Sequence, residues 1–136
     1  MSAPREDADV ETSSEGYARR FAGPVGRFFL ERQAEATLAL LRPFPGASVL
    51  DVGGGHGQVT GPLVEAGYDV TVLGSDASCE SRVREWTGAG RARFVPSDLL
   101  APSLPERSFD VALSYRLLPH VARWPDLVAA LGRLAR

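Results

Sequence analysis

The sequence contains no lysine, only one cysteine and no long apolar run. Its 15 basic residues are all arginine and stand against 17 acidic residues, which gives a net charge of −2. This balance gives no basis for a nucleic-acid partner, and the arginine bias is typical of a GC-rich genome rather than of phosphate recognition. The single cysteine, Cys79, excludes an internal disulfide and a cysteine metal cluster, as is usual in the reducing cytoplasm. No apolar run approaches the roughly 20 residues of a membrane span, so we expect no membrane partner. With a single cysteine we also expect no metal site.

The composition that remains is that of one globular domain. The chain has 136 residues, of which 44% are hydrophobic, and both values suit a single domain with its own core. Residues 1–15 are acidic and polar, contain too few apolar residues to fold, and do not form a secretory signal. We therefore expect a flexible acidic tail over 1–15 and one folded domain over 16–136.

Strand-like and helix-like patterns alternate along this domain. The predicted strands cover 47–52, 69–73, 92–96 and 109–114, and the predicted helices cover 26–41, 58–67, 78–86 and 125–136. Pro62 lies inside the second of these helices, where it is tolerated only near the first turn. The alternation predicts an α/β fold, namely a doubly wound parallel sheet with helices on both faces.

Four glycines follow the first predicted strand within five residues. They are Gly53, Gly54, Gly55 and Gly57 in the stretch "LDVGGGHG" at 50–57. Glycine lets the backbone turn sharply and lets a ligand approach closely, and ligands of such sheets bind at the carboxyl ends of the strands. One or two glycines would suffice for a turn without a ligand. The loop therefore predicts a ligand site.

The spacing of the loop indicates which ligand it suits. The dinucleotide fingerprint G-x-G-x-x-G needs a glycine at position 58, which is Gln58. The observed order is G-x-G-x-G, with Asp51 two residues before the first glycine. A carboxylate there would repel a pyrophosphate and suits a ligand with a cationic end. The stretch "LDVGGGHGQ" resembles the first motif of class I S-adenosylmethionine-dependent methyltransferases, and the similarity runs from about Tyr17 to the end of the chain, closest to the type 11, ubiquinone-biosynthesis-like branch.

This resemblance implies a partial Rossmann-like sheet of strand order 3-2-1-4 and S-adenosylmethionine as the cofactor, with S-adenosylhomocysteine as the product. In such proteins the glycine loop contacts the methionine part of the cofactor, and the Asp51 position orients that end. An acid that ends the second strand holds the ribose hydroxyls. Here the usual spacing falls near Gly74, so Asp76 is the candidate, with Ser75 as the alternative.

Three further stretches extend the resemblance. "PSDLL" at 96–100 resembles the adenine-binding turn, in which Asp98 would accept from the adenine amino group beside the Leu99 amide. "FDVALSYRLLPHV" at 109–121 resembles the fourth-strand motif, in which Ser114 and Tyr115 would line the cofactor. "YARRFAGPVGRFFLE" at 17–31 resembles the segment that closes over the cofactor, where Tyr17 or Arg20 would meet its carboxylate.

Several of these residues have simpler interpretations. Asp98 has the alternative role of capping a turn, and Tyr17 and Arg20 that of the rim of an amphipathic helix. His120 is a weak candidate for a general base, because in this family its position usually packs beside the fourth-strand loop. His56 either reaches the cofactor or substrate or is exposed, and Cys79 is expected to be a small buried residue.

The function implied by the resemblance is methyl transfer to a small-molecule acceptor, achieved mainly by positioning. The sequence specifies neither the acceptor nor whether O, N or C is methylated. Two other hypotheses stay open: a methyltransferase-derived binding or interaction module without turnover, and a Rossmann-type protein for another nucleotide. The chain ends at Arg136, whereas the family continues with three more strands. We therefore expect an open edge on the fourth strand, covered in a homo-oligomer or by a partner.

Overall fold

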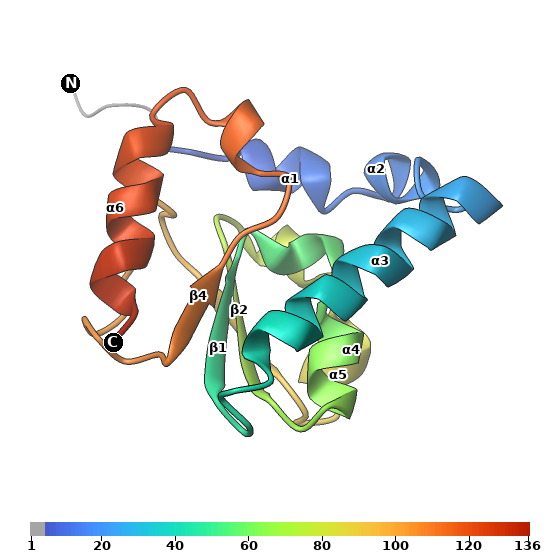
Figure 1. Cartoon of the computed structure of the whole chain (residues 1–136). Coiled ribbons are helices and arrows are strands. Elements are labelled where there is room, and N and C mark those ends of the chain that lie inside the picture. Colours follow the sequence, from blue (N-terminus) through green and yellow to red (C-terminus); the bar gives the residue numbers. More distant parts are fainter. Residues whose placement is uncertain (1–4) are drawn as a thin grey trace.

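The centre of the molecule is a four-stranded parallel sheet. The structure is a computed structural model that describes residues 5–136. The strands are β1 (Ser48–Val52), β2 (Asp69–Gly74), β3 (Arg93–Pro96) and β4 (Val111–Leu113). They lie in the order β3-β2-β1-β4, and each neighbouring pair is parallel (Figure 1). The expected order 3-2-1-4 is confirmed.

Helices precede β1, connect β1 to β2 and β2 to β3, and follow β4, whereas β3 and β4 are joined by a segment without a helix. They are α1 (Ala8–Thr12), α2 (Glu15–Arg19), α3 (Pro24–Leu41), α4 (Thr60–Glu65), α5 (Arg84–Thr87) and α6 (Trp124–Leu134), with short 3-10 turns η1 (Gly54–His56), η2 (Ala77–Glu80) and η3 (Leu118–His120). Pro62 lies in the first turn of α4, where a missing N–H costs nothing. The helix expected over 78–86 is instead divided into η2 and α5, and Val83 between them is fully buried.

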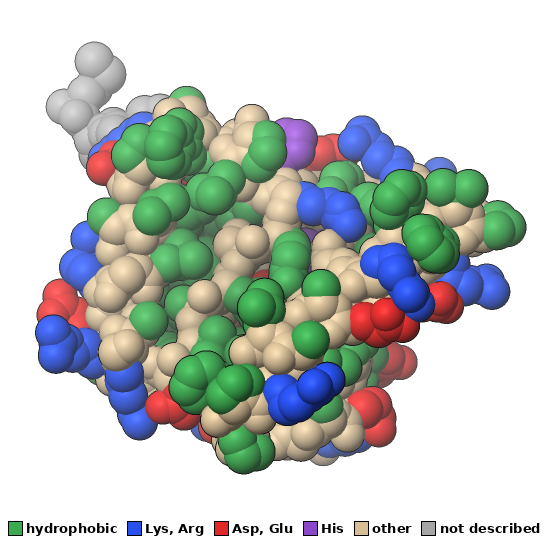
Figure 2. Space-filling view, viewed as in Figure 1, with side chains coloured by type: hydrophobic (Ala, Val, Ile, Leu, Met, Phe, Trp, Pro, Cys, Tyr) green, Lys and Arg blue, Asp and Glu red, His purple; other side chains and the backbone are tan. Residues whose placement is uncertain are grey.

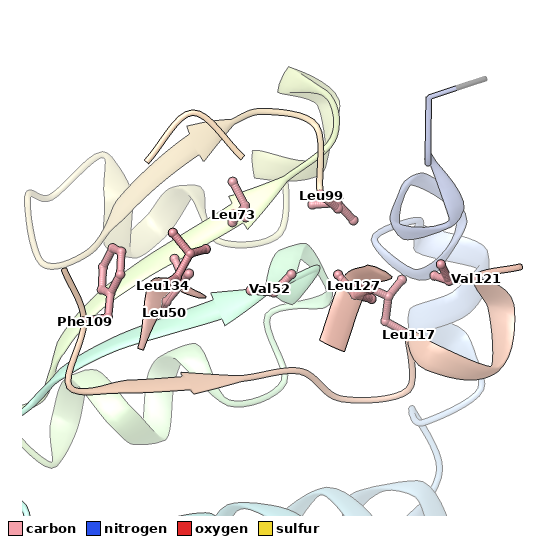
Figure 3. Close-up of a cluster of buried hydrophobic side chains, with 9 residues drawn as sticks. All are labelled: Leu50, Val52, Leu73, Leu99, Phe109, Leu117, Val121, Leu127 and Leu134. Atoms are coloured by element: carbon pink, nitrogen blue, oxygen red, sulfur yellow. The ribbon is translucent and has the colours of Figure 1, made fainter. Parts of the chain in front are cut away.

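Two hydrophobic clusters, one on each face of the sheet, form the core. Side chains alternate between the faces along a strand. Leu50 and Val52 of β1 therefore join one cluster, which Figure 3 shows, and Val49 joins the other. The first cluster includes Leu127 and Leu134 of α6. The second includes side chains of α3 and α4. Figure 1 accordingly shows α6 on one side of the sheet and α3 and α4 on the other, so the predicted two-sided cover is confirmed.

The N-terminal segment differs from its expectation. Residues 8–12 form α1, in which Asp9 and Thr12 are buried. A solvated tail is therefore wrong for this part of 1–15, and residues 1–4 lie outside the described residues. The segment has few apolar side chains, as expected, but Asp9 accepts a hydrogen bond from the backbone N–H of Ser75 at 2.7 Å. A buried polar contact of this kind leaves no trace in hydrophobic periodicity.

The edge of β4 and the N-terminal end of α3 are the two surfaces to consider for a partner protein. β4 forms one outer strand of the described sheet, and an oligomer or partner on its edge stays a prediction. Figure 2 shows hydrophobic side chains gathered at the N-terminal end of α3, where Val25, Phe28 and Phe29 are 55–70% exposed. None of the described helices combines the length and the apolar character needed to cross a bilayer.

Candidate functional site

The glycine loop turns the chain from β1 into α4. Gly53 (φ +70°) and Gly57 (φ +72°) both adopt the left-handed conformation that favours glycine, and η1 lies between them. A Cβ on Gly54 would overlap with the Asp51 carboxylate, and a Cβ on Gly55 would overlap with the Cys79 carbonyl oxygen. The loop is therefore folded tightly over β1 and η2. We call the glycine loop, together with Asp51 and Ser75, the cradle.

Asp51 lies beneath the loop as an unusually isolated buried acid. Its side chain is fully buried, and neither carboxylate oxygen has a hydrogen-bond partner among the described residues. Burial raises the pKa of Asp51 from 3.8 to about 7, because the charged form is poorly solvated there. A buried carboxylate without a partner is costly. A donor or a cation brought to this position would stabilise it.

His56, within the loop, is buried and neutral. Its Nδ1 accepts a hydrogen bond from the Gln58 N–H at 3.0 Å, which places the proton on Nε2. Burial lowers the pKa of His56 from 6.5 to about 4, and the charges of Arg116 and Arg82 act in the same direction. Nε2 has no partner in the described chain. The exposed alternative for His56 is therefore wrong, and an N–H donor is left available in the loop.

The two acids after β2 and β3 both cap local turns. Asp76 is exposed, and its Oδ1 accepts from the Ser78 N–H at 2.9 Å. Hydrogen bonding from Ser78, chiefly from its backbone N–H, holds the pKa of Asp76 below its usual value. Asp98 is half-buried, and its Oδ1 accepts from the Leu100 N–H at 3.0 Å, while Leu99 is fully buried. Each carboxylate keeps a second oxygen, so their assignments to ribose and adenine stay predictions.

Tyr17, Arg20 and His120 lie together, although the sequence separates His120 from the other two. With Ala8, Glu11 and Thr12 they line a cavity of about 380 Å³, which we call the N-terminal cavity. The Arg20 guanidinium lies 5.3 Å from the centre of the Tyr17 ring. The roles of Tyr17 and Arg20 at a cofactor carboxylate, and of His120 as a base, stay predictions.

Two polar residues, Ser114 and Arg116, follow β4 at the carboxyl end of the sheet, where the glycine loop also lies. The Ser114 hydroxyl donates to the Val52 carbonyl at 2.9 Å. Arg116 has a left-handed φ of +59°, which is unusual for a residue with a side chain. Its guanidinium donates to Gln33 Oε1 at 2.9 Å and lies 4.7 Å from the centre of the Phe21 ring. The sequence reasoning missed Arg116, and no residue pattern marks its backbone conformation.

Buried polar atoms without partners are concentrated around the cradle. Among the described residues there are seven such side-chain atoms, and they belong to Asp9, Ser13, Asp51, His56, Thr60 and Ser75. These residues lie in β1 and its loop, at the start of α4, directly after β2, and in the α1–α2 segment. Unpaired buried polar groups are few in native proteins, and a cluster of them requires an explanation such as a ligand. The sequence analysis did not identify Asp9 or Ser13 as part of this cluster.

Comparisons with known proteins point to one family. A family model described as a methyltransferase domain matches residues 49–136. Ubiquinone biosynthesis O-methyltransferase of Paramagnetospirillum magneticum is 35% identical over 120 residues, which are 80% of this chain and 45% of that protein. Nocamycin O-methyltransferase of Saccharothrix syringae is 36% identical over 119 residues, which are 82% of this chain and 41% of that protein. The chain thus spans less than half the length of these two relatives.

Solved structures agree on the fold. A protein of Methanococcus maripaludis, described as a candidate S-adenosyl-L-methionine-dependent methyltransferase, superposes with a TM-score of 0.76 at 13% identity. The match covers 100% of this chain and 63% of that one. A glycopeptide N-methyltransferase superposes with a TM-score of 0.64 at 20% identity, over 76% of this chain and 51% of that one. At these identities the likeness supports a shared fold.

Proposed function

The chain belongs to the methyltransferase-domain family, and from this premise we propose that it binds S-adenosylmethionine in the cradle and takes part in methyl transfer to a small molecule. The observation that carries the proposal is the cluster of buried, unpartnered polar atoms around the glycine loop. The Asp51 carboxylate suits a cationic end of the cofactor. The His56 Nε2–H and the Ser75 hydroxyl suit its oxygen acceptors. These donor and acceptor types fit a zwitterionic ligand that carries a ribose.

The residues of this chain would act by binding and orientation. S-adenosylmethionine supplies a methyl group that its sulfonium already activates, so the protein has to align an acceptor with that group. Asp51 and the loop would fix the methionine end, and Asp98 would fix the adenine at the other end. Both curated relatives are O-methyltransferases, which supports a hydroxyl acceptor. The single, buried Cys79 supports a cytoplasmic setting.

The binding proposal is tested by comparing ligands on one protein sample. We expect S-adenosylhomocysteine and S-adenosylmethionine to raise the melting temperature of the chain and NADH to leave it unchanged, because a ligand stabilises the state that it binds. Stabilisation by NADH alone would contradict the proposal and support a Rossmann-type protein for another nucleotide. Binding without methyl transfer to any of a panel of phenols and catechols would support a module without turnover.

Asp98→Ala is expected to weaken S-adenosylhomocysteine binding by about 1–3 kcal/mol, the usual result of leaving a buried polar group unpaired. The loss should be smaller for the inosyl analogue, which lacks the amino group that Asp98 would accept from. Calorimetric titration measures both. Asp98→Asn is the matched control, because its side-chain oxygen can still accept from the Leu100 N–H. Equal losses for both ligands would remove Asp98 from the adenine site.

A further inference from the structure

α1 lies directly on the cradle. The Asp9 carboxylate accepts from the Ser75 N–H at 2.7 Å, just beyond the end of β2, and the Cys79 thiol donates to the same oxygen at 3.4 Å. A Cβ on Gly53 would lie 3.6 Å from Asp9 Cβ. A Cβ on Gly55 would overlap with the Ser13 hydroxyl. Figure 1 shows α1 crossing one end of the sheet beside the turn that follows β1. The segment thus fills the space in front of the loop.

The polar groups that hold α1 in this place are incompletely satisfied. The helix has five residues, and Glu6 Oε1 accepts from the Ala8 N–H at its N-terminus at 2.9 Å. A helix this short is not stable by itself. Its Ala8 packs against the first hydrophobic cluster. Asp9 Oδ1 and the Ser13 hydroxyl are buried and have no hydrogen-bond partner within residues 5–136, which costs free energy. The segment is attached to the cradle at Ser75, whose N–H donates to Asp9 of α1 and whose carbonyl accepts from Arg5 just before the helix. The bond to Asp9 is the one that α1 itself makes to the cradle.

Resting on the function proposed above, we propose that α1 is a gate that competes with the cofactor for the cradle. When α1 is seated, Asp9 takes the Ser75 N–H and Ser13 occupies the space in front of Gly55. When α1 has moved away, both the N–H and the space are open to the cofactor. The apparent affinity is then the intrinsic affinity reduced by the fraction of molecules whose gate is open. The residues Ala8, Glu11 and Thr12 of α1 also line the N-terminal cavity. Movement of α1 would therefore connect this cavity with the cradle.

Asp9→Ala tests the gate, because a gate predicts that this variant binds S-adenosylhomocysteine more tightly and a ligand-binding role predicts that it binds more weakly. Loss of the bond to Ser75 leaves a buried N–H unpaired only when α1 is seated, so the variant favours the open state. We expect S-adenosylhomocysteine to bind about five- to tenfold more tightly by calorimetry, because the open fraction rises. Asp9→Asn, which keeps a weaker acceptor, should give a smaller gain. Asp7→Ala is the control, because Asp7 is exposed and its side chain caps nothing, and it should bind like the wild type.

Cys79 provides a second measurement that needs no ligand. It is the only cysteine in the chain and is fully buried beside Asp9. A neutral thiol reagent should label it faster in folded Asp9→Ala, verified by a melt, than in the wild type or Asp7→Ala. Weaker S-adenosylhomocysteine binding by Asp9→Ala would overturn the gate and make Asp9 a ligand-binding residue. Unchanged binding and labelling in the variant would also overturn it. If the wild type itself fails to bind, the proposed function fails first, and the gate fails with it.

Discussion

Asp51→Asn is expected to stabilise the folded protein at pH 8 and to weaken S-adenosylhomocysteine binding at least tenfold. Above its pKa of about 7 the Asp51 side chain is a buried carboxylate with no hydrogen-bond partner in the part of the chain that the structure describes. Each unit of this shift corresponds to about 1.4 kcal/mol, so the neutral amide should raise the free energy of unfolding by about 2–4 kcal/mol at pH 8. Binding should fall because the amide offers no charge to a cationic ligand. Denaturant melts and calorimetry measure the two effects.

Asp126→Asn is the matched control for this variant. Asp126 forms an exposed ion pair with Arg123, and changes at such positions alter stability by about 0.5 kcal/mol or less. The variant should bind S-adenosylhomocysteine as the wild type does. A lower stability of Asp51→Asn at pH 8 would show that the carboxylate has a partner in the protein, and unimpaired binding would remove it from the cofactor site.

Asp51 and His56 give opposite contributions to the pH dependence of stability. The pKa of Asp51 rises from 3.8 to about 7 on folding, so the folded state holds its proton longer and stability falls as the pH rises through this range. The pKa of His56 falls from 6.5 to about 4, so the unfolded state holds the proton longer and stability rises with pH between these values. The two slopes oppose each other in the wild type. Asp51→Asn should therefore show stability that rises between pH 4 and 6.5, and a falling profile in its thermal melts would contradict the assignment.

Gly55→Val is expected to abolish detectable S-adenosylhomocysteine binding and to lower the free energy of unfolding by about 1–3 kcal/mol, as overpacking does. The new Cβ would overlap with the Cys79 carbonyl oxygen, a backbone atom that has little freedom to move. The added methyl groups would also fill the space that a ligand needs on the loop. Calorimetry on a sample shown to be folded by its melt measures the loss of binding.

Gly132→Ala is the control for Gly55→Val. Gly132 lies in α6, and an added Cβ there would have nothing within 4 Å. Alanine should keep cofactor binding and raise stability slightly, because it favours a helix over glycine by up to about 1 kcal/mol. If folded Gly55→Val binds as tightly as Gly132→Ala, the glycine loop is not the cofactor site.

The sheet and its loop could be predicted because their signals are local. Runs of buried β-branched residues, such as those around Val49 and Val70, mark the strands. The spacing of the glycines marks the turn, and the position of Asp51 before them suggested a cationic ligand. The partial fold and the strand order followed from the family resemblance, and the structure agrees with both.

The covering of the cradle could not be predicted because it depends on contacts between distant positions. Asp9 reaches Ser75, which is 66 residues away, and no periodic pattern indicates that pairing. The burial of His56 has a similar origin, since the glycines on both sides were equally compatible with an exposed side chain and with one that reaches the cofactor or substrate. The break between η2 and α5 escaped prediction because the inward position of Val83 depends on the second hydrophobic cluster.

The central claim is that S-adenosylhomocysteine binds in the cradle with its cationic end at Asp51. Its most direct test is calorimetric titration of the wild-type chain at pH 6 and pH 8, in buffers of different ionisation enthalpy. Since the pKa of Asp51 is about 7, a cation at its carboxylate would displace the proton at the lower pH. We predict saturable binding of one ligand per chain at both pH values, with close to one proton released at pH 6 and almost none at pH 8. No saturable binding, or binding at pH 6 without proton release, would contradict the claim.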